Sequence, residues 1–330
     1  MRRLNAEDGA TTVVVAITLI VLFGMGALVL DVGNLFWERR QLQNAADAGA
    51  LAAAQDYAWG DGAAAAEASA RHYTSENNTR DAFVEGISQP TSTSVKVDTI
   101  TGDAGGVGVL RSFLAGVIGT DEYLARATAT ATWGAMSSGR SLPVTISYCE
   151  WLDAVYLEPG ATAPDYSFSD EIVTLSLLDP QQSGPNCTGP AGQQTPGGWG
   201  WLDPQGGECE AVIDEFGWVG GNTGSSPPSP ANHTGCTDAF FAGLIGETVL
   251  VPIFVADNEL TGNNAEFQIV GFGAFKIDGF RIGGNWTGGN VPCDNPERCF
   301  SGTFERYVEL GAQGEFGGID LGATSVILTE

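Results

Sequence analysis

The chain is poor in basic residues, and this shortage excludes partners that carry negative charge. Its 330 residues contain 14 Lys and Arg against 40 Asp and Glu, for a formal net charge of −26 at pH 7. Most of the imbalance lies in residues 143–330, which hold 25 acids and 4 bases. Such a surface repels nucleic acid and anionic lipid, so we expect no nucleic-acid partner. The acidity is typical of a highly soluble surface; a function in binding cations is the alternative.

Histidine is nearly absent, which leaves little material for acid–base or zinc chemistry. His72 lies in a segment rich in Ala and polar residues, and His233 lies in a loop of Pro, Ser and Gly. Neither has an identifiable partner for nucleophilic catalysis, and the sequence contains no zinc-ligand spacing and no phosphate-binding loop. We predict that both histidines are surface residues.

Acidic motifs are present but incomplete. Asp214 and Glu215 form the kind of carboxylate pair that glycosidases use, yet such pairs arise by chance among 40 acids. Residues 257–263 resemble the first half of a calcium loop, but Gln268 stands where that loop needs a bidentate Glu. The sequence therefore predicts no catalytic residue, no cofactor and no metal ligand; a looser calcium site at 257–263 stays open beside a polar hairpin turn.

Cysteine is missing from the first 148 residues. The six cysteines lie in the Gly- and Pro-rich remainder, at Cys149, Cys187, Cys209, Cys236, Cys293 and Cys299. An even number confined to such a region predicts disulfides and an oxidising compartment. The short spacing of Cys293 and Cys299 favours a local bridge, and Cys209 and Cys236 flank a flexible excursion. Cys149 would then pair with Cys187, although six cysteines allow 15 connectivities.

Charge is also missing from Ala10 to Leu30, a run of 21 residues. As a helix this run is about 31 Å long, which matches the hydrocarbon core of a bilayer. It is too long for the apolar part of a typical signal peptide, and the nearest suitable cleavage string, Ala50-Leu51-Ala52, lies too far downstream. We therefore predict a single transmembrane helix over residues 10–30.

The orientation of this helix follows from the cysteines more than from charge. Arg2 and Arg3 favour a cytoplasmic N-terminus, whereas Arg39 and Arg40 on the far flank oppose it. Disulfides, in contrast, need an oxidising compartment. We predict a cytoplasmic segment over residues 1–9, a single pass through the cell membrane, and an extracytoplasmic location for the bulk of the chain.

Residues 31–133 are expected to form a helical and α/β module. Asn34 to Ala58 are mostly good helix formers, so the transmembrane helix is expected to run on into them, with Trp37 near the membrane interface. Residues 122–133 alternate between an Ala face and a polar face, which is typical of a strand. The remaining predictions are helices over 63–76 and 107–118, strands over 83–87 and 95–100, and a linker over 134–141.

Residues 142–330 predict a domain of another kind. Short β-like runs alternate with Gly, Pro, Asn and Asp, and only Asp238–Ile245 has helical character, with Thr237 as its N-cap. The expected fold is a disulfide-bonded, mostly β sandwich or jelly roll, which makes the whole chain α+β. The predicted strands are 144–148, 172–177, 211–213, 249–255, 267–275, 304–310 and 326–328.

The N-terminal residues carry a family resemblance. Asp8-Gly9-Ala10 precedes the apolar run, Asp31-Val32-Gly33-Asn34-Leu35 follows it, and residues 38–48 read ERRQLQNAADA. In this order they resemble the N-terminal module of TadG-like proteins of tight-adherence (Flp-type) pilus assembly. Residues 50–135, with the distal strings GWGWLD (198–203) and IVGFGAF (269–275), resemble actinobacterial members. The resemblance implies a membrane-anchored, pilin-like module whose partners are other Tad pilus or assembly proteins.

Two motifs that occur in related proteins are incomplete or lack their usual context in this sequence. Prepilins that are cut by prepilin peptidase have a Glu five residues after the Gly, but Val14 stands there after Gly9, so we expect a retained anchor. Some TadG proteins contain a von Willebrand A domain with a D-x-S-x-S metal motif. Residues 165–169 match that string, but residues 160–164 (GATAP) precede it in place of a buried strand. An ordinary polar turn is therefore expected there.

Three functions compete. The leading one is a non-catalytic, membrane-anchored envelope component of Flp pilus assembly, either a minor pilin-like subunit or an assembly accessory. The second is a surface-displayed module that binds glycan or protein through exposed aromatic residues, for which core packing is the competing interpretation; the candidates are Trp199, Trp201, Trp218 and Trp286. The third is a membrane-tethered secreted hydrolase, which the lack of a His-based constellation disfavours.

Overall fold

The computed structural model describes residues 7–77, 82–103, 106–107, 110–111, 122–157, 166–177, 187–204, 209–214, 216–227, 235–260, 262–283, 286–310 and 316–329. The chain forms two compact units, Met1–Thr132 with Leu328–Glu330, and Trp133–Ile327. The finer division into 31–133, 134–141 and 142–330 stays a prediction. Within the range predicted as a linker, the structure has the end of one strand and the whole of another, β7 (Gly139–Ser141).

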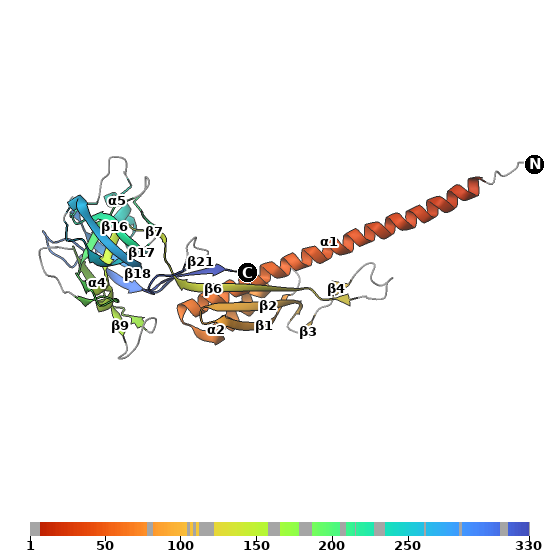
Figure 1. Cartoon of the computed structure of the whole chain (residues 1–330), viewed down its shortest axis with the longest axis horizontal. Helices are drawn as coiled ribbons and strands as arrows, with labels where there is room; N and C mark the ends of the chain where they lie inside the picture. The colour runs from red at the N-terminus through yellow and green to blue at the C-terminus, as the bar shows by residue number, and fades with distance from the viewer. Residues whose placement is uncertain are drawn as a thin grey trace, which may run out of the picture. The chain divides into compact units, whose positions relative to one another are not determined.

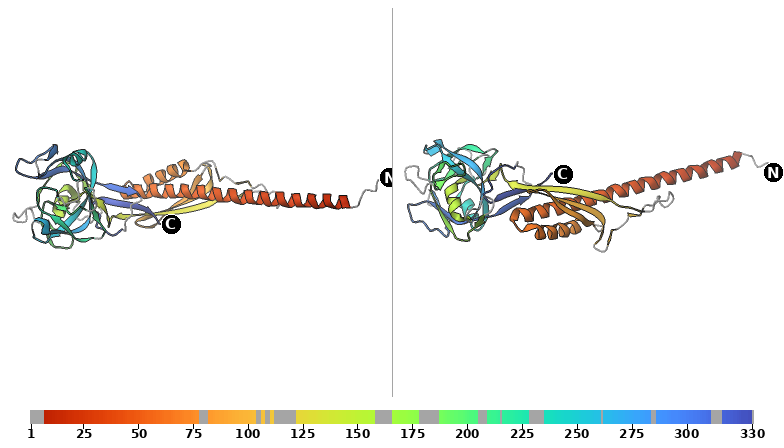
Figure 2. Two further views of the ribbon diagram at one scale, coloured as in Figure 1. Left: turned by 90° about the horizontal axis from the view of Figure 1, so that it is seen from above. Right: turned by 60° about the horizontal axis from the view of Figure 1, so that its bottom comes forward.

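One helix dominates the first unit. Helix α1 runs without interruption from Glu7 to Trp59, a length of 53 residues (Figure 1). This confirms the prediction that the apolar run continues into the Ala-rich segment as one helix. Gly60, with a φ of 90°, ends it, because glycine enters the left-handed region without steric cost. Helix α2 (Gly62–Glu76) then lies alongside the C-terminal half of α1 (Figure 2).

Small side chains allow α1 and α2 to approach closely. The fully buried residues of this contact are mostly alanines: Ala46, Ala50, Ala53, Ala66 and Ala70. At Gly49 a Cβ atom would clash with Thr74 Oγ1 and would lie 3.1 Å from the carbonyl oxygen of Ala70. Thr74 Oγ1 itself donates to the carbonyl oxygen of Ala45 at 3.2 Å. The helix pair therefore depends on glycine at position 49.

An antiparallel sheet completes the first unit. Within this unit its strands follow the order β1 (Ala82–Thr91), β2 (Ser94–Asp103) and β6 (Arg126–Ala135), which are antiparallel members of a six-stranded sheet. The predicted alternation in β6 is confirmed, since Ala127, Ala129 and Ala131 are buried while Arg126 and Thr128 are exposed. The polar face carries an ion pair of 2.8 Å between Arg126 and Glu85. The inward face packs on α1.

Two details of the first unit differ from the prediction. The helix predicted over 107–118 is wrong where the structure describes it, because β3 (Gly106–Val107) and β4 (Leu110–Arg111) are strands. β3 pairs with β2, and β4 pairs with β5 (Glu122–Tyr123), so local strand pairing replaces helix; residues 108–109 and 112–118 lie outside the described part. In addition, the backbone N–H of Thr329 donates to the carbonyl oxygen of Thr130 at 2.9 Å, so the last described residue belongs to this unit.

The second unit is mostly β. Its helices are α4 (Tyr148–Ala154), α5 (Asp238–Gly243) and the 3-10 turn η1 (Gly262–Asn264). Besides β7, its strands are β8 (Val144–Ser147), β9 (Val155–Leu157), β10 (Tyr166–Phe168), β11 (Val173–Ser176), β12 (Cys187–Thr188), β13 (Gln194–Thr195), β14 (Trp199–Leu202), β15 (Ala211–Ile213), β16 (Gly217–Asn222), β17 (Thr248–Asp257), β18 (Ala265–Arg281), β19 (Thr287–Gly289), β20 (Cys299–Glu305), β21 (Tyr307–Leu310) and β22 (Ala323–Leu328).

The main sheet of the second unit closes on itself. Its order runs β8, β14, β16, β18 and β17, and β17 also pairs in parallel with β8 through Ile253 opposite Ile146. The long strand β18 continues beyond this ring to pair with β20, which pairs with β11. The predicted mostly β domain is confirmed. Its strands, however, form a closed ring in place of the two facing sheets of a sandwich or jelly roll.

Aromatic rings pack against glycines in the core of this unit. Trp199 and Trp201 are both 0% exposed and meet edge to face with ring centroids 5.3 Å apart. Between them, Gly200 lies under the ring of Phe267, where a Cβ would clash with the ring carbons. Gly221 on β16 faces the same ring. The Gly-rich composition of these strands thus serves close packing.

Helix α4 was not predicted, because the sequence suggested a strand up to Tyr148. The side chain of Ser147 accepts a hydrogen bond from the backbone N–H of Cys149 at 3.0 Å and so caps a helix there. The predicted helix at Asp238 is confirmed, and Thr237 Oγ1 caps it by accepting the N–H of Phe240 at 3.2 Å. This cap at the end of a strand therefore explains why α4 follows β8 directly.

We expect Gly49→Val to destabilise the first unit by about 1–3 kcal/mol, because the added carbons must displace Thr74 and the backbone near Ala70. Gly33→Ala is the matched control, since nothing lies within 4 Å of a Cβ at that position and alanine favours helix. Thermal unfolding of the full chain in nanodiscs, followed by circular dichroism at 222 nm, measures both. Equal unfolding temperatures for the two variants would contradict this account of the helix pair.

Candidate functional site

Large apolar side chains cover the N-terminal half of α1 and remain exposed. They are between 47% and 75% exposed: Val13, Val14, Val15, Ile17, Leu19, Ile20, Val21, Leu22, Phe23, Met25, Leu28, Val29 and Leu30. Exposed apolar surface costs about 25 cal/mol per Å² in water, so a continuous patch marks an interaction with lipid or another protein. Within the described residues α1 is the one helix long and apolar enough to cross a membrane. This half of the helix suggests membrane anchoring.

The exposed surface of α1 continues beyond the predicted span. Leu35 and Trp37 are each 40% exposed and Phe36 is 68% exposed, and the exposed Arg39 and Arg40 follow. Aromatic and basic residues are typical of the ends of membrane helices. The sequence pointed to Trp37 at this level but not to Phe36. The missed signal is that large apolar residues continue past Leu30, before the small-residue segment that packs on α2 begins.

The packed half of α1 begins at Glu38, which is 0% exposed, and Leu42 one turn later is fully buried as well. The carbonyl oxygen of Leu42 accepts a hydrogen bond of 3.3 Å from Thr99 Oγ1 of β2. One residue later, Gln43 Nε2 donates to the carbonyl oxygen of Thr128 on β6 at 2.9 Å. A single helix therefore passes from a fully exposed apolar surface to a surface fixed by the sheet within about one and a half turns after Trp37.

The cysteines are brought together in three disulfides, Cys149–Cys187, Cys209–Cys236 and Cys293–Cys299. This is the pairing that the spacing favoured, and none of the six is a free thiol. The Cys209–Cys236 bridge joins the chain just before β15 to the chain just before α5. A disulfide of this kind contributes roughly 2–4 kcal/mol to the free energy of unfolding.

The calcium-like segment forms a hairpin turn. Asn258 Oδ1 accepts the backbone N–H groups of Leu260 at 3.2 Å and Glu266 at 3.1 Å, so its oxygen already serves the turn. Burial raises the pKa of Asp257 above its ordinary value. Within the described part of the chain, no group of three or more His, Cys, Asp or Glu residues is arranged to hold a metal ion.

The other candidate residues are scattered. His72 is exposed on α2, as predicted, and His233 lies outside the described residues. Asp214 is exposed, while Glu215 is outside the described part. Of the D-x-S-x-S string, Tyr166–Phe168 is strand β10, paired with β9, and Asp165 is not described. The structure brings none of the described members together into a constellation for catalysis.

One acid outside these motifs is perturbed. Burial raises the pKa of Glu150 in α4 above its ordinary value. Glu150 Oε1 accepts the backbone N–H of Gly198 at 2.9 Å, and this bond connects α4 to the start of β14. We therefore assign Glu150 a structural role: its hydrogen bond helps to hold α4 against β14.

The tryptophans divide between core and surface. Trp199 and Trp201 are fully buried, whereas Trp218 is 52% exposed on β16. Trp199 and Trp201, the two tryptophans of GWGWLD, therefore pack in the core and are not available to bind a ligand at the surface. Trp286 is partly buried against Phe241, so Trp218 is the most exposed of the four candidate tryptophans.

Residues 9–56 match the model of a protein family described as "Putative Flp pilus-assembly TadE/G-like". Comparisons with curated proteins and with solved structures find no match. The matched residues lie within α1 and contain both its exposed apolar half and most of its packed half. The likeness of later segments to actinobacterial members stays a prediction. The N-terminal module of the chain is therefore TadE/G-like, and it links the protein to Flp pilus assembly.

Proposed function

We propose that the protein is a non-catalytic, membrane-anchored envelope component of Flp pilus assembly, either a minor pilin-like subunit or an assembly accessory. One observation carries the proposal: the family-matched helix α1 has an exposed apolar half and a half packed on an Ala-rich helix and a sheet. Such a helix suits a protein that is held in lipid by one end and presents a folded unit at the other.

The proposal includes an orientation. The N-terminus would be cytoplasmic and the bulk of the chain extracytoplasmic. The three disulfides of the second unit support this, because such bonds persist in oxidising compartments. Arg2 and Arg3 at the N-terminus agree with it, and Arg39 and Arg40 oppose it weakly.

The proposed partners are other Tad proteins, met through the membrane helix. Gly24, Gly26 and Gly33 have no heavy atom within 4 Å of where a Cβ would stand, so their surface is open to a neighbour. Small residues of this kind let transmembrane helices approach closely. A partner helix would bury part of the apolar surface that the structure leaves exposed.

A surface-binding role is the second candidate, and Trp218 is the observation that favours it. Its half-exposed ring could stack on a sugar or a partner side chain. The burial of Trp199 and Trp201, with the partial burial of Trp286, reduces the aromatic surface that this role would use. No observation among the described residues favours a tethered hydrolase.

The orientation predicts the behaviour of the cysteines in cells. On spheroplasts, external protease should digest the chain beyond residue 34, and all six cysteines should resist alkylation until a reductant is added, because they are bridged outside the cytoplasm. Detection of a cytoplasmic marker protein controls for lysis. A protected chain with thiols that react without reductant would contradict the proposed orientation.

The anchor predicts the effect of a charge in its middle. Ile20→Arg should weaken membrane insertion by about 2.5–3.5 kcal/mol, since a guanidinium replaces a side chain that is 71% exposed at the centre of the span. His72→Arg places the same charge on exposed α2 and should change nothing. Carbonate extraction of membranes, followed by immunoblotting, measures both variants. Equal retention of the two in the membrane fraction would argue against an anchor at residues 10–30.

The pilus role predicts a loss of pili without this protein. Deleting the gene in a strain that makes Flp pili should reduce piliation and surface adhesion, and the wild-type chain supplied in trans should restore both. The Ile20→Arg chain should fail to restore them because it lacks a stable anchor. Normal piliation, adhesion and secretion in the deletion strain would exclude the proposed function.

A further inference from the structure

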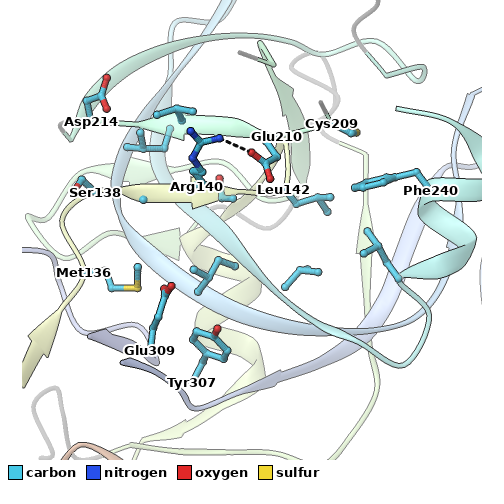
Figure 3. Close-up of a pocket in the computed structure, with 17 residues that line it drawn as sticks. Met136, Ser138, Arg140, Leu142, Cys209, Glu210, Asp214, Phe240, Tyr307 and Glu309 are labelled. Atoms are coloured by element: carbon cyan, nitrogen blue, oxygen red, sulfur yellow. Dashed lines mark hydrogen bonds and ion pairs between the residues drawn. The ribbon is translucent and has the colours of Figure 1, made fainter. Parts of the chain in front are cut away.

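A cleft of about 670 Å³ opens in the second unit and belongs to none of the sites above (Figure 3). This volume lies within the range of about 300–1,000 Å³ that is typical of ligand sites. Its walls come from β7 and the residues before it, from β15, from α5, from the start of β17 and from β21. Five elements of the second unit thus converge on one space.

The floor of the cleft is apolar. It is formed by members of both hydrophobic clusters of the unit, with Leu142, Phe240 and Val249 from one and Ile213 and Leu250 from the other. Phe240, Val249 and Leu250 are only partly buried, in contrast to the closed packing around Trp201. The cleft therefore offers apolar surface that the fold itself does not cover.

The rim of the cleft is acidic. Arg140 and Glu210 form an ion pair of 3.0 Å on one side, and Glu309 stands on the opposite side (Figure 3). Asp214 is a third acid at the rim. The one base is already paired, whereas neither Asp214 nor Glu309 has an ion pair or side-chain hydrogen bond with a described residue. The lining thus has two carboxylates in excess.

Glu309 is the acid placed to receive a cation. It is half-buried, and it points toward the same space as Tyr307, two residues earlier on β21. Burial raises the pKa of Tyr307, and the charge of Glu309 raises it further, so the phenol stays a hydrogen-bond donor beside the carboxylate. A positive group attracts a half-buried carboxylate more strongly than it attracts a fully solvated carboxylate, because the effective dielectric constant around the half-buried group is lower.

Two walls of the cleft are held by covalent and backbone bonds. The Cys209–Cys236 disulfide fixes Glu210 relative to α5, which carries Phe240. On the other side, β21 pairs in parallel with β22 and with no other described strand. An end strand beside an apolar cleft is the arrangement by which extended peptides are commonly bound, through backbone bonds and side-chain pockets.

We propose that this cleft binds an extended peptide segment of a partner protein, with a basic side chain directed to Glu309 between apolar side chains that enter the floor. Charge complementarity selects the basic residue, and the floor formed by Leu142, Val249 and Leu250 selects its apolar neighbours. The site lies wholly in the second unit, so it is independent of the membrane helix and of the pilus assignment.

Three tripeptides test the proposal with the full-length chain in nanodiscs of zwitterionic lipid. They are acetyl-Leu-Lys-Leu-amide, its Gln analogue and its Glu analogue, and saturation-transfer difference NMR measures their binding after subtraction of empty nanodiscs. We expect the Lys peptide to bind most tightly and the Glu peptide most weakly. Equal binding of the Lys and Glu peptides, or no binding of any of them, would overturn the proposal.

Substitutions of residues inside and outside the cleft test whether the peptides bind there. Glu309→Gln should weaken the Lys peptide about fivefold and leave the Gln peptide unchanged, because only the charge contact is lost. Glu171→Gln removes an equal charge from an exposed position outside the cleft and should have no effect. Val249→Trp, which fills the floor, should abolish binding of all three peptides while a thermal melt shows a folded chain.

Two outcomes would reject the assignment even if something binds. The first is a Lys peptide that binds Glu309→Gln as well as it binds the wild-type chain. The second is binding of phenethylamine, a small cation with an apolar ring, without binding of any tripeptide, since that would identify a small-molecule site.

Discussion

Helix α1 is one continuous helix with two different surfaces: an exposed apolar surface in its N-terminal half and a buried, Ala-rich surface in its C-terminal half. Helix α2 and the sheet of the first unit pack on the second of these surfaces. Up to Trp37 its side chains are large, apolar and exposed, and from Leu42 onward they are mostly small and covered. An uninterrupted helix satisfies its own backbone groups in lipid, where no water can replace the missing hydrogen bonds. The same regular backbone then provides a flat, Ala-rich surface for α2 and the sheet. The change of side-chain size along one helix therefore separates the two environments.

The second unit is packed differently, since several of its strands contain glycines that face the core. Aromatic rings fill the space over these glycines beside the aliphatic core residues: Phe267 lies on Gly200 and Gly221, and Trp199 and Trp201 pack edge to face. The three disulfides limit the freedom of the chain in the unfolded state. Acidic residues remain mainly at the surface, where they keep the unit soluble. The fold thus combines an aromatic core with covalent restraint of its loops.

The sequence was most informative where a periodic pattern was long. The apolar run and the Ala-rich segment predicted α1, and the alternation of residues 122–133 predicted β6, because burial on one face imposes a regular period. Strands β14 and β16 escaped prediction, since glycines at positions such as 200 and 221 hide the alternation that ring packing produces. Helix α4 was missed because the cap at Ser147 is a single local bond. Of the candidate sites, the anchor was predictable from composition alone. The cleft was not, since its lining residues are distant in sequence and each looks ordinary there.

The bond between Thr329 and Thr130 has a consequence for biosynthesis. Residues on either side of the whole second unit in the chain meet in the first unit. During synthesis the anchor, α2 and the three strands emerge long before residue 329 does. The first unit therefore gains this backbone contact only after the second unit has been synthesised. Formation of this one hydrogen bond is in this way coupled to the synthesis of the second unit.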